Sequence, residues 1–314
     1  MQKAYIDAVY ELAQNDKNVV MLTADNGTDF DKWFQREFPE QYFDMGISEG
    51  NMVGVAAGMT TCGKIPFVQT AGAFLTYRAF EFIRNDVCLQ KSNVKLVGSG
   101  SGLSISTLGP THHTTEDISI LRSLPGMTIL SPCSPKEVYE CIYAAYKIQG
   151  PVYIRLGMNG EEEIYPSEYT FQLGKCVEIC KGKDAVIFVT GSIIAEAIKA
   201  AAMLKTESGI ELKVINVHTL KPILNAELMK QVGNISVVCT LEEHNIYGGL
   251  GSILAECLCE EQWSGKLIKL GLRDCFASGY GSISDVRKKN KIDRVCIAEA
   301  VRRAISGKAS NGIY

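Results

Sequence analysis

Glu49 is the residue whose surroundings in the sequence most clearly suit proton chemistry. It precedes residues 50–59, a run of small and mostly apolar residues with helical character. A carboxyl group there has little water around it, and because an isolated buried charge is costly, the group is either paired or has a raised pKa. Two roles are open on this basis: proton transfer, or a carboxylate that interacts with the dipole at the start of a helix.

Three aromatic residues at intervals of three form a second candidate feature. Phe74, Tyr77 and Phe80 would lie on neighbouring turns of one helix, able to wall a flat apolar pocket. Aromatic side chains at helical spacing also commonly form ordinary core. The spacing alone leaves both interpretations open.

His112 is a third candidate because it follows a turn signal, Gly109-Pro110-Thr111. Glycine and proline fix such a turn, and catalytic side chains are often presented on loops of this kind. The four histidines of the chain include no pair at the helical spacing of metal ligands, so we predict no metal site.

Strand and helix patterns alternate along the whole chain and must position these residues. The predicted elements before residue 157 are strands at 19–22, 67–70, 94–98, 127–130 and 152–155, and helices at 4–15, 51–61, 76–90, 115–123 and 135–148. Later elements are strands at 185–190, 212–217, 237–241 and 267–270, and helices at 193–205, 226–231, 252–261 and 298–305. This alternation predicts an α/β fold with a doubly wound, mostly parallel sheet, followed by a smaller α/β domain.

A glycine-bearing, acidic stretch from residue 157 to 167 separates the two sets of elements. Its composition is typical of a linker. We therefore predict a first domain over residues 1–160, a linker over 161–173 and a second domain over 174–314. The loop 248–251 between a strand and a helix could cradle a phosphate, but it lacks the full glycine spacing, and a structural turn is favoured.

Bulk composition excludes several classes of protein. The 314 residues are 46% hydrophobic and carry a net charge of −3, which gives no general attraction to nucleic acid or to an anionic membrane. The apolar run from 185 to 204 is interrupted by charged residues, and the first residues lack a signal core. We expect a soluble, cytoplasmic protein whose 11 cysteines, Cys62 among them, are mostly buried reduced thiols.

Several segments, in order and at suitable spacing, resemble the C-terminal half of transketolases, which use thiamine diphosphate. The matching segments are Thr23-Ala24-Asp25, Gly46-Ile47-Ser48-Glu49, residues 74–85, Gly109-Pro110-Thr111-His112, residues 150–157 and Leu241-Glu242-Glu243-His244. They extend over nearly the whole chain. The resemblance implies a pyrimidine-binding domain followed by the C-terminal domain of that family.

The resemblance assigns a role to each candidate residue. Glu49 matches the glutamate that hydrogen-bonds N1′ of the aminopyrimidine, where a shared proton favours the imino form that activates the thiazolium. Phe74 would stack on the pyrimidine, with Tyr77 and Phe80 completing the pocket. Asp25 matches an aspartate near the thiazolium, although an Asx-turn role is equally open.

The resemblance also implies a substrate-binding group. His112 matches a histidine that contacts hydroxyl groups of the donor, and His113 stands where the family usually has glutamine. Gly100, Leu108 and Met158 fall at positions where phosphosugar transketolases carry a histidine, an aspartate and an arginine. Since these changes remove strong charge-assisted contacts, we predict that at least one substrate is not an ordinary sugar phosphate, unless Arg78, Arg155 or a partner residue replaces them. His218 and His244 are expected to be structural.

The absence of the family's diphosphate-binding motif from this sequence implies a partner chain. The diphosphate and Mg²⁺ are held in this family by a Gly-Asp-Gly motif with a later asparagine, and no Gly-Asp-Gly occurs in this sequence. The resemblance therefore implies a separate N-terminal subunit that holds Mg²⁺, an α2β2 heterotetramer and small sugar-like substrates. Alternatives are the β subunit of a 2-oxo acid dehydrogenase, a deoxyxylulose phosphate synthase, and a non-catalytic scaffold subunit.

Overall fold

The computed structural model describes residues 1–24, 28–158, 162–166 and 168–307, and the chain forms two compact units. The first unit contains Met1–Ser101 and Ile120–Leu173, and the second contains Gly102–Ser119 and the chain from Gly174 onwards. The chain therefore passes into the second unit at residue 102, well before the predicted linker, and returns at residue 120. This early excursion carries His112 and His113.

The first unit is built on a parallel sheet. Its strands are β1 (Val19–Thr23), β2 (Tyr42–Asp44), β3 (Ile65–Ala71), β4 (Lys95–Ser99), β5 (Thr128–Leu130) and β6 (Val152–Arg155). They lie in the order β5-β6-β4-β3-β1-β2, and every pair between them is parallel. Strands buried on both faces read as continuous apolar runs, which is why β1, β4, β5 and β6 were visible in the sequence. The predicted doubly wound, mostly parallel sheet is confirmed.

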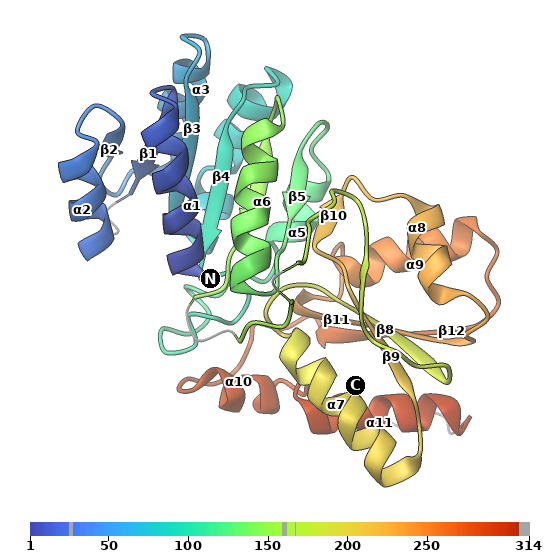
Figure 1. Ribbon diagram of the computed structural model, residues 1–314. Coiled ribbons are helices and arrows are strands. Elements are labelled where there is room, and N and C mark those ends of the chain that lie inside the picture. Colours follow the sequence, from blue (N-terminus) through green and yellow to red (C-terminus); the bar gives the residue numbers. More distant parts are fainter. Residues whose placement is uncertain (25–27, 159–161, 167, 308–314) are drawn as a thin grey trace. The chain divides into compact units, whose positions relative to one another are not determined.

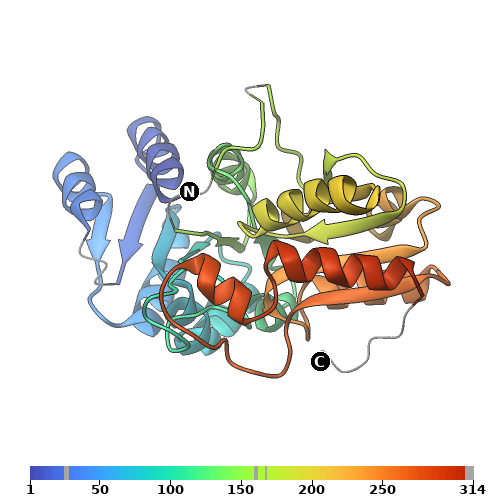
Figure 2. The same cartoon turned by 90° about the horizontal axis from the view of Figure 1, so that it is seen from below.

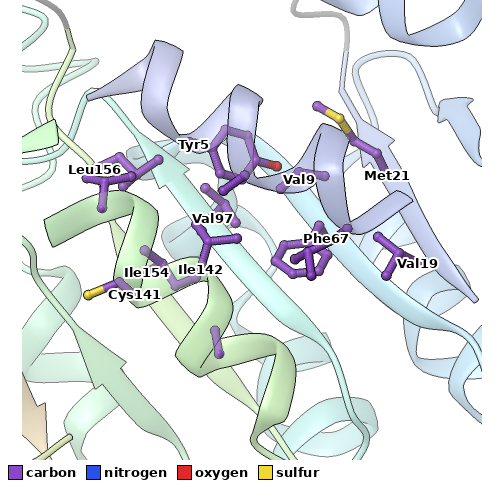
Figure 3. Close-up of a cluster of buried hydrophobic side chains, with 14 of the residues drawn as sticks. Tyr5, Val9, Val19, Met21, Phe67, Val97, Cys141, Ile142, Ile154 and Leu156 are labelled. Atoms are coloured by element: carbon purple, nitrogen blue, oxygen red, sulfur yellow. The ribbon is translucent and has the colours of Figure 1, made fainter. Parts of the chain in front are cut away.

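Helices α1 (Gln2–Asn15) and α6 (Pro135–Lys147) cover one face of this sheet (Figure 1). Tyr5 and Val9 of α1 and Ile142 of α6 meet Phe67 and Ile154 from the strands in one buried cluster (Figure 3). The Ser134 side chain accepts a hydrogen bond from the Glu137 amide and so caps α6. The helical segment of residues 74–90 lies on the opposite face (Figure 2).

The remaining helices of the first part of the chain are α2 (Asp29–Glu37), α3 (Glu49–Thr60) and α5 (Asp117–Arg122). Sequence patterns missed α2, whose start is fixed by a reciprocal capping box between Thr28 and Asp31. They placed the start of α3 two residues late. Glu49 is the first residue of α3, so its predicted position at the start of an apolar helix is confirmed.

The aromatic segment is not the single helix that the spacing predicted over residues 76–90. It consists of a π-helical segment (Phe74–Arg78), the short α4 (Phe80–Phe82) and a second π-helical segment (Ile83–Leu89). The wider π turns change the angular spacing of the side chains and often mark functional sites. Phe82 lies against α3, where an added β-carbon on Gly50 would be 2.8 Å from its ring. Glycine at position 50 therefore lets this segment approach α3 closely.

A lysine lies buried at the start of β4. Lys95 is 0% exposed, and its Nζ donates hydrogen bonds to the carbonyl oxygens of Ile148 and Gly150, at 2.6 and 3.0 Å, and to Asn93 Oδ1 at 2.7 Å. Burial lowers the pKa of Lys95 to about 7. The strand end is thus fixed to the turn before β6 by a group whose charge is costly to bury.

The second unit has a mixed sheet in the order β12-β11-β8-β9-β7. The strands of this part of the chain are β7 (Val177–Cys180), β8 (Ala185–Val189), β9 (Leu212–Asn216), β10 (Thr219–Lys221), β11 (Val237–Asn245) and β12 (Lys266–Leu272). Helices α7 (Ile194–Ser208) and α11 (Arg294–Ile305) lie on one face, and α8 (Asn225–Val232) and α9 (Leu250–Glu260) on the other (Figure 1). The sequence missed the antiparallel edge strand β7, the short β10 and helix α10 (Ile283–Lys289).

Within the described residues, no helix is both long enough and apolar enough to cross a membrane. All eleven cysteines are free. Cys62, predicted to be buried, is exposed because it lies in the turn after α3. Cys259 and Cys275 are exposed as well.

Candidate active site

The Glu49 carboxyl group is buried at the start of α3 and is paired. Its side chain is 2% exposed, and Arg78 Nη1 donates a hydrogen bond of 2.7 Å to Glu49 Oε2. The Arg78 side chain is 51% exposed, so one end of the pair faces solvent. Of the two states expected for a carboxyl in an apolar helix, the structure contains the paired one.

An aromatic ring completes this group of side chains. The Arg78 guanidinium lies 4.9 Å from the centroid of the Phe74 ring, within the range of a cation–π contact. The first unit thus brings together a buried carboxyl, a guanidinium and the half-buried ring of Phe74. Tyr77 is 40% exposed and Phe80 half-buried. Their role as pocket walls stays a prediction, as does that of Asp25, which lies outside the described residues.

His112 and His113 lie on a closed loop of the second unit, residues 102–114, which we call the substrate loop. Gly102 and Thr114 close its base with two backbone hydrogen bonds of 3.0 and 2.9 Å. The predicted turn is present: Gly109 has φ +75°, and its carbonyl accepts from the amides of His112 and His113 at 3.0 and 3.2 Å. These two hydrogen bonds fix the backbone of the turn at both histidines.

The two histidines have different surroundings. His112 is half-buried, with its Nδ1 2.9 Å from Thr111 Oγ1. His113 is 3% exposed, and neither of its ring nitrogens has a hydrogen-bond partner among the described residues. Burial lowers the pKa of His113, and the charges of Glu243 and Glu116 oppose this shift only in part. The neutral imidazole is thus favoured at position 113.

The three positions predicted to depart from phosphosugar transketolases offer no charged contacts. Leu108 lies on the substrate loop and is 54% exposed. Gly100 is buried at a turn with φ +67° in the first unit. Met158, also in the first unit, is engaged with the start of α1, since its Sδ lies 3.6 Å from Gln2 Nε2. Their role in substrate binding stays a prediction.

The glycine loop before α9 is filled by a carboxylate. Glu242, which is 0% exposed, accepts hydrogen bonds of 2.8 Å from the amides of both Leu250 and Gly251. A β-carbon on Gly249 would lie 2.0 Å from Glu242 Oε2. This carboxylate satisfies the helix start that a phosphate would otherwise occupy, which favours the structural turn.

His244 is held from both sides in the second unit. Its Nδ1 lies 2.6 Å from the Asn245 carbonyl, and its Nε2 accepts from the Ser119 amide at 3.3 Å. This geometry favours the expected structural role. Across the described ranges, no three His, Cys, Asp or Glu side chains are grouped so as to hold a metal ion.

Comparison with protein families identifies the family to which this chain belongs. The family profile "Transketolase, pyrimidine binding domain" matches residues 1–159, and "Transketolase, C-terminal domain" matches residues 174–286. The chain belongs to the transketolase family. The predicted family is confirmed, and the group around Glu49 lies in its pyrimidine-binding domain.

Relatives of similar length are subunits of transketolases. The chain is 37% identical over 290 residues to the 6-deoxy-6-sulfo-D-fructose transketolase subunit SqwH of Clostridium sp. (strain MSTE9), a match that spans 92% of this chain and 89% of that protein. It is 35% identical over 300 residues to a subunit of the apulose-4-phosphate transketolase of Actinobacillus succinogenes, with 95% of each chain covered. A solved structure described as a split gene transketolase, inactive beta4 tetramer, has 37% identity and a TM-score of 0.89, covering 98% of this chain and 99% of that one.

The transketolase coenzyme fits the residues of the first unit. Glu49 has a buried carboxyl group and Phe74 a half-buried ring, both in contact with Arg78, and these are the groups that could offer a hydrogen-bond partner and a stacking surface to an aminopyrimidine. Arg78 as the partner of Glu49 was missed from sequence because 29 residues separate the two. The pairing of Glu243 with Arg287 was missed for the same reason, with 44 residues between them.

Proposed function

We propose that this chain is the C-terminal subunit of a two-subunit, thiamine diphosphate-dependent transketolase that transfers a two-carbon ketol unit from a ketone donor to an aldehyde acceptor. Both family profiles and the near full-length match to named transketolase subunits support this role. The observation that carries it is the buried Glu49 carboxyl in the pyrimidine-binding domain, paired with Arg78, whose guanidinium lies over the Phe74 ring.

Thiamine diphosphate, when bound, supplies the carbon nucleophile and the electron sink for this transfer. Glu49 would then share a proton with the pyrimidine ring. Because Arg78 holds Oε2 of Glu49, we assign the proton to the other oxygen, Oε1. Phe74 would orient the ring by stacking, and His112 would bind donor hydroxyl groups from the substrate loop.

A partner subunit is needed for the charged end of the coenzyme. The sequence contains no Gly-Asp-Gly motif, and the described residues offer no metal-binding group. Large apolar side chains around Glu49 are exposed: Ile47 is 74%, Tyr77 40% and Phe82 37% exposed. A partner that covered these side chains would remove their apolar surface from water. We propose that an N-terminal subunit carrying Mg²⁺ and the diphosphate contacts covers it, in an α2β2 assembly.

The proposed substrate is a modified sugar, different from the ordinary phosphosugars. Gly100, Leu108 and Met158 provide no charged donors where such substrates are usually held. Two relatives are named for 6-deoxy-6-sulfo-D-fructose and apulose-4-phosphate, and these names support a modified ketose as the substrate. Sulfonate or phosphate groups would then be bound by other residues, with Arg78 and Arg155 as candidates.

Reconstitution tests the proposal. The chain would be mixed with an N-terminal partner that contains Gly-Asp-Gly, and ketol transfer measured with 6-deoxy-6-sulfo-D-fructose, apulose-4-phosphate and xylulose 5-phosphate as donors. We expect coenzyme-dependent transfer only in the mixture, faster with a modified ketose, and a 2:2 complex in native mass spectrometry.

Each part of the proposal has its own contrary result. Fast transfer from xylulose 5-phosphate to ribose 5-phosphate would refute the substrate assignment alone. Release of carbon dioxide from pyruvate would favour a 2-oxo acid dehydrogenase subunit. Activity of the chain without any partner would refute the split architecture.

A further inference from the structure

The base of the substrate loop is seated on the end of β11. An added β-carbon on Gly102 would lie 2.7 Å from Glu243 Oε2 and 2.8 Å from Glu243 Cβ, so the loop backbone rests directly on this side chain. At the other end of the loop, the Asn245 amide donates a 2.7 Å hydrogen bond to the Thr115 carbonyl. The position of the loop therefore depends on where β11 holds Glu243.

Glu243 is fixed in turn by an arginine of α10. Arg287 Nε donates a 2.6 Å hydrogen bond to Glu243 Oε1, and the two side chains are 9% and 3% exposed. Arg287 Nη2 also reaches Ser192 Oγ at 3.4 Å. A buried pair of this kind restricts geometry, because removing one partner leaves the other charge unpaired.

The segment that leads into α10 contacts the loop at two further places. Ser106 Oγ donates a 2.7 Å hydrogen bond to the Gly281 carbonyl, and the Gly281 amide returns one of 3.3 Å to the Ser106 carbonyl. Tyr280 lies so close to Gly109 that a β-carbon there would be 2.2 Å from its ring. The loop is thus held at its base by the Glu243–Arg287 pair and along its length by the segment that precedes α10.

We propose that Glu243 and Arg287 form a positioning pair that fixes the substrate loop and so sets His112 and His113 toward the substrate. This inference rests on the proposed function for its catalytic consequence, but its structural consequence is independent of any activity. The pair acts through Gly102, whose backbone rests on Glu243, and through the charge of Glu243 on His113.

Hydrogen exchange on the full chain tests the structural part. The amides of Gly102 and Thr114 close the loop, so their exchange reports its opening. In Arg287→Met we expect these amides to exchange about tenfold faster, the scale of losing a charge-assisted hydrogen bond. Lys288→Met, an exposed neighbour on the same helix, is the matched control and should leave them unchanged. Unchanged exchange in Arg287→Met would overturn the proposal.

Kinetics of the reconstituted complex test the catalytic part. Arg287→Met should raise KM for the ketose donor about tenfold while kcat changes less than about threefold, since contacts made equally in ground and transition states are weakened. Arg287→Lys, which keeps the positive charge, should restore most of the affinity. The uncompensated Glu243 carboxylate should also raise the pKa of His113 and move the pH dependence of KM to higher pH.

The outcomes separate the two proposals. A lower melting temperature of Arg287→Met with KM within twofold of wild type would make the pair merely structural. A wild-type complex that transfers no ketol unit would refute the proposed function, while the exchange experiment still decides on the pair. If Arg287→Met does not fold, Glu243→Gln, which keeps the shape and an acceptor oxygen, tests the same loop amides, and unchanged exchange there counts against the proposal.

Discussion

Replacing Glu49 with glutamine separates a catalytic carboxyl from a structural one. Glutamine has nearly the same shape and keeps one acceptor oxygen, but it cannot take up or share the proton in the same way. In the wild type, Glu49 Oε2 and Arg78 Nη1 are 2.7 Å apart. The substitution therefore replaces an ion pair with a hydrogen bond from the charged Arg78 to a neutral amide oxygen, and it leaves the packing of α3 in place.

The structure sets the size of the expected stability change. Because the Arg78 side chain is 51% exposed, water can solvate its charge once the carboxylate is removed, and the pair resembles a surface pair more than a buried one. We expect a loss of at most about 1 kcal/mol, which for a chain of 314 residues lowers the melting temperature by about 1–2 °C. Assembly with the partner should be unaffected.

The expected loss of activity is much larger. Positioned acid–base groups contribute about 10²–10⁴-fold to rate, so Glu49→Gln should reduce ketol transfer at least ~100-fold. The assay is transfer by the reconstituted complex, with assembly followed by native mass spectrometry. Glu37→Gln is the matched control, since Glu37 also pairs with an arginine, Arg36, at 3.4 Å but lies on the exposed side of α2.

Two results would refute this reasoning. Turnover of Glu49→Gln within about threefold of wild type would mean that the proton relay does not pass through this carboxyl, and would support the scaffold alternative. Failure of the variant to assemble would mean that Glu49 acts mainly in structure.

Two further predictions concern buried charges. The free energy of unfolding of the wild type should rise between about pH 7 and pH 10, because burial lowers the pKa of Lys95 to about 7 and the unfolded chain keeps this proton to higher pH. Urea denaturation at several pH values should show that this rise is lost in Lys95→Met. If Lys95→Met shows the same rise, other groups cause it. Glu242→Ala should destabilise the chain by about 2–4 kcal/mol because two buried amides at the start of α9 lose their acceptor. The exposed Glu261→Ala serves as the control in chemical denaturation, and equal effects of the two would show that the cap contributes nothing specific.

Strands were predicted well from the sequence where all their residues are buried. Strands such as β1 and β4 are buried along their whole length, so their apolar runs were legible. The segment from Phe74 to Leu89 was predicted as one α-helix because propensity does not distinguish α from π turns. Its form depends on how Phe82 packs against Gly50 and Gly54 of α3, a contact between distant parts of the chain.

Local spacing and chemistry thus identified Glu49, the aromatic segment and the turn before His112, and the order of motifs along the chain identified the family. The tertiary structure alone decided what each of these groups touches: Arg78 on Glu49, Glu242 in the loop before α9, and Glu243 with Arg287 beneath the substrate loop. The physical reason is that a charge buried by folding takes its partner from whichever segment packs beside it, and that segment is set by the sheet and its crossovers rather than by distance along the chain.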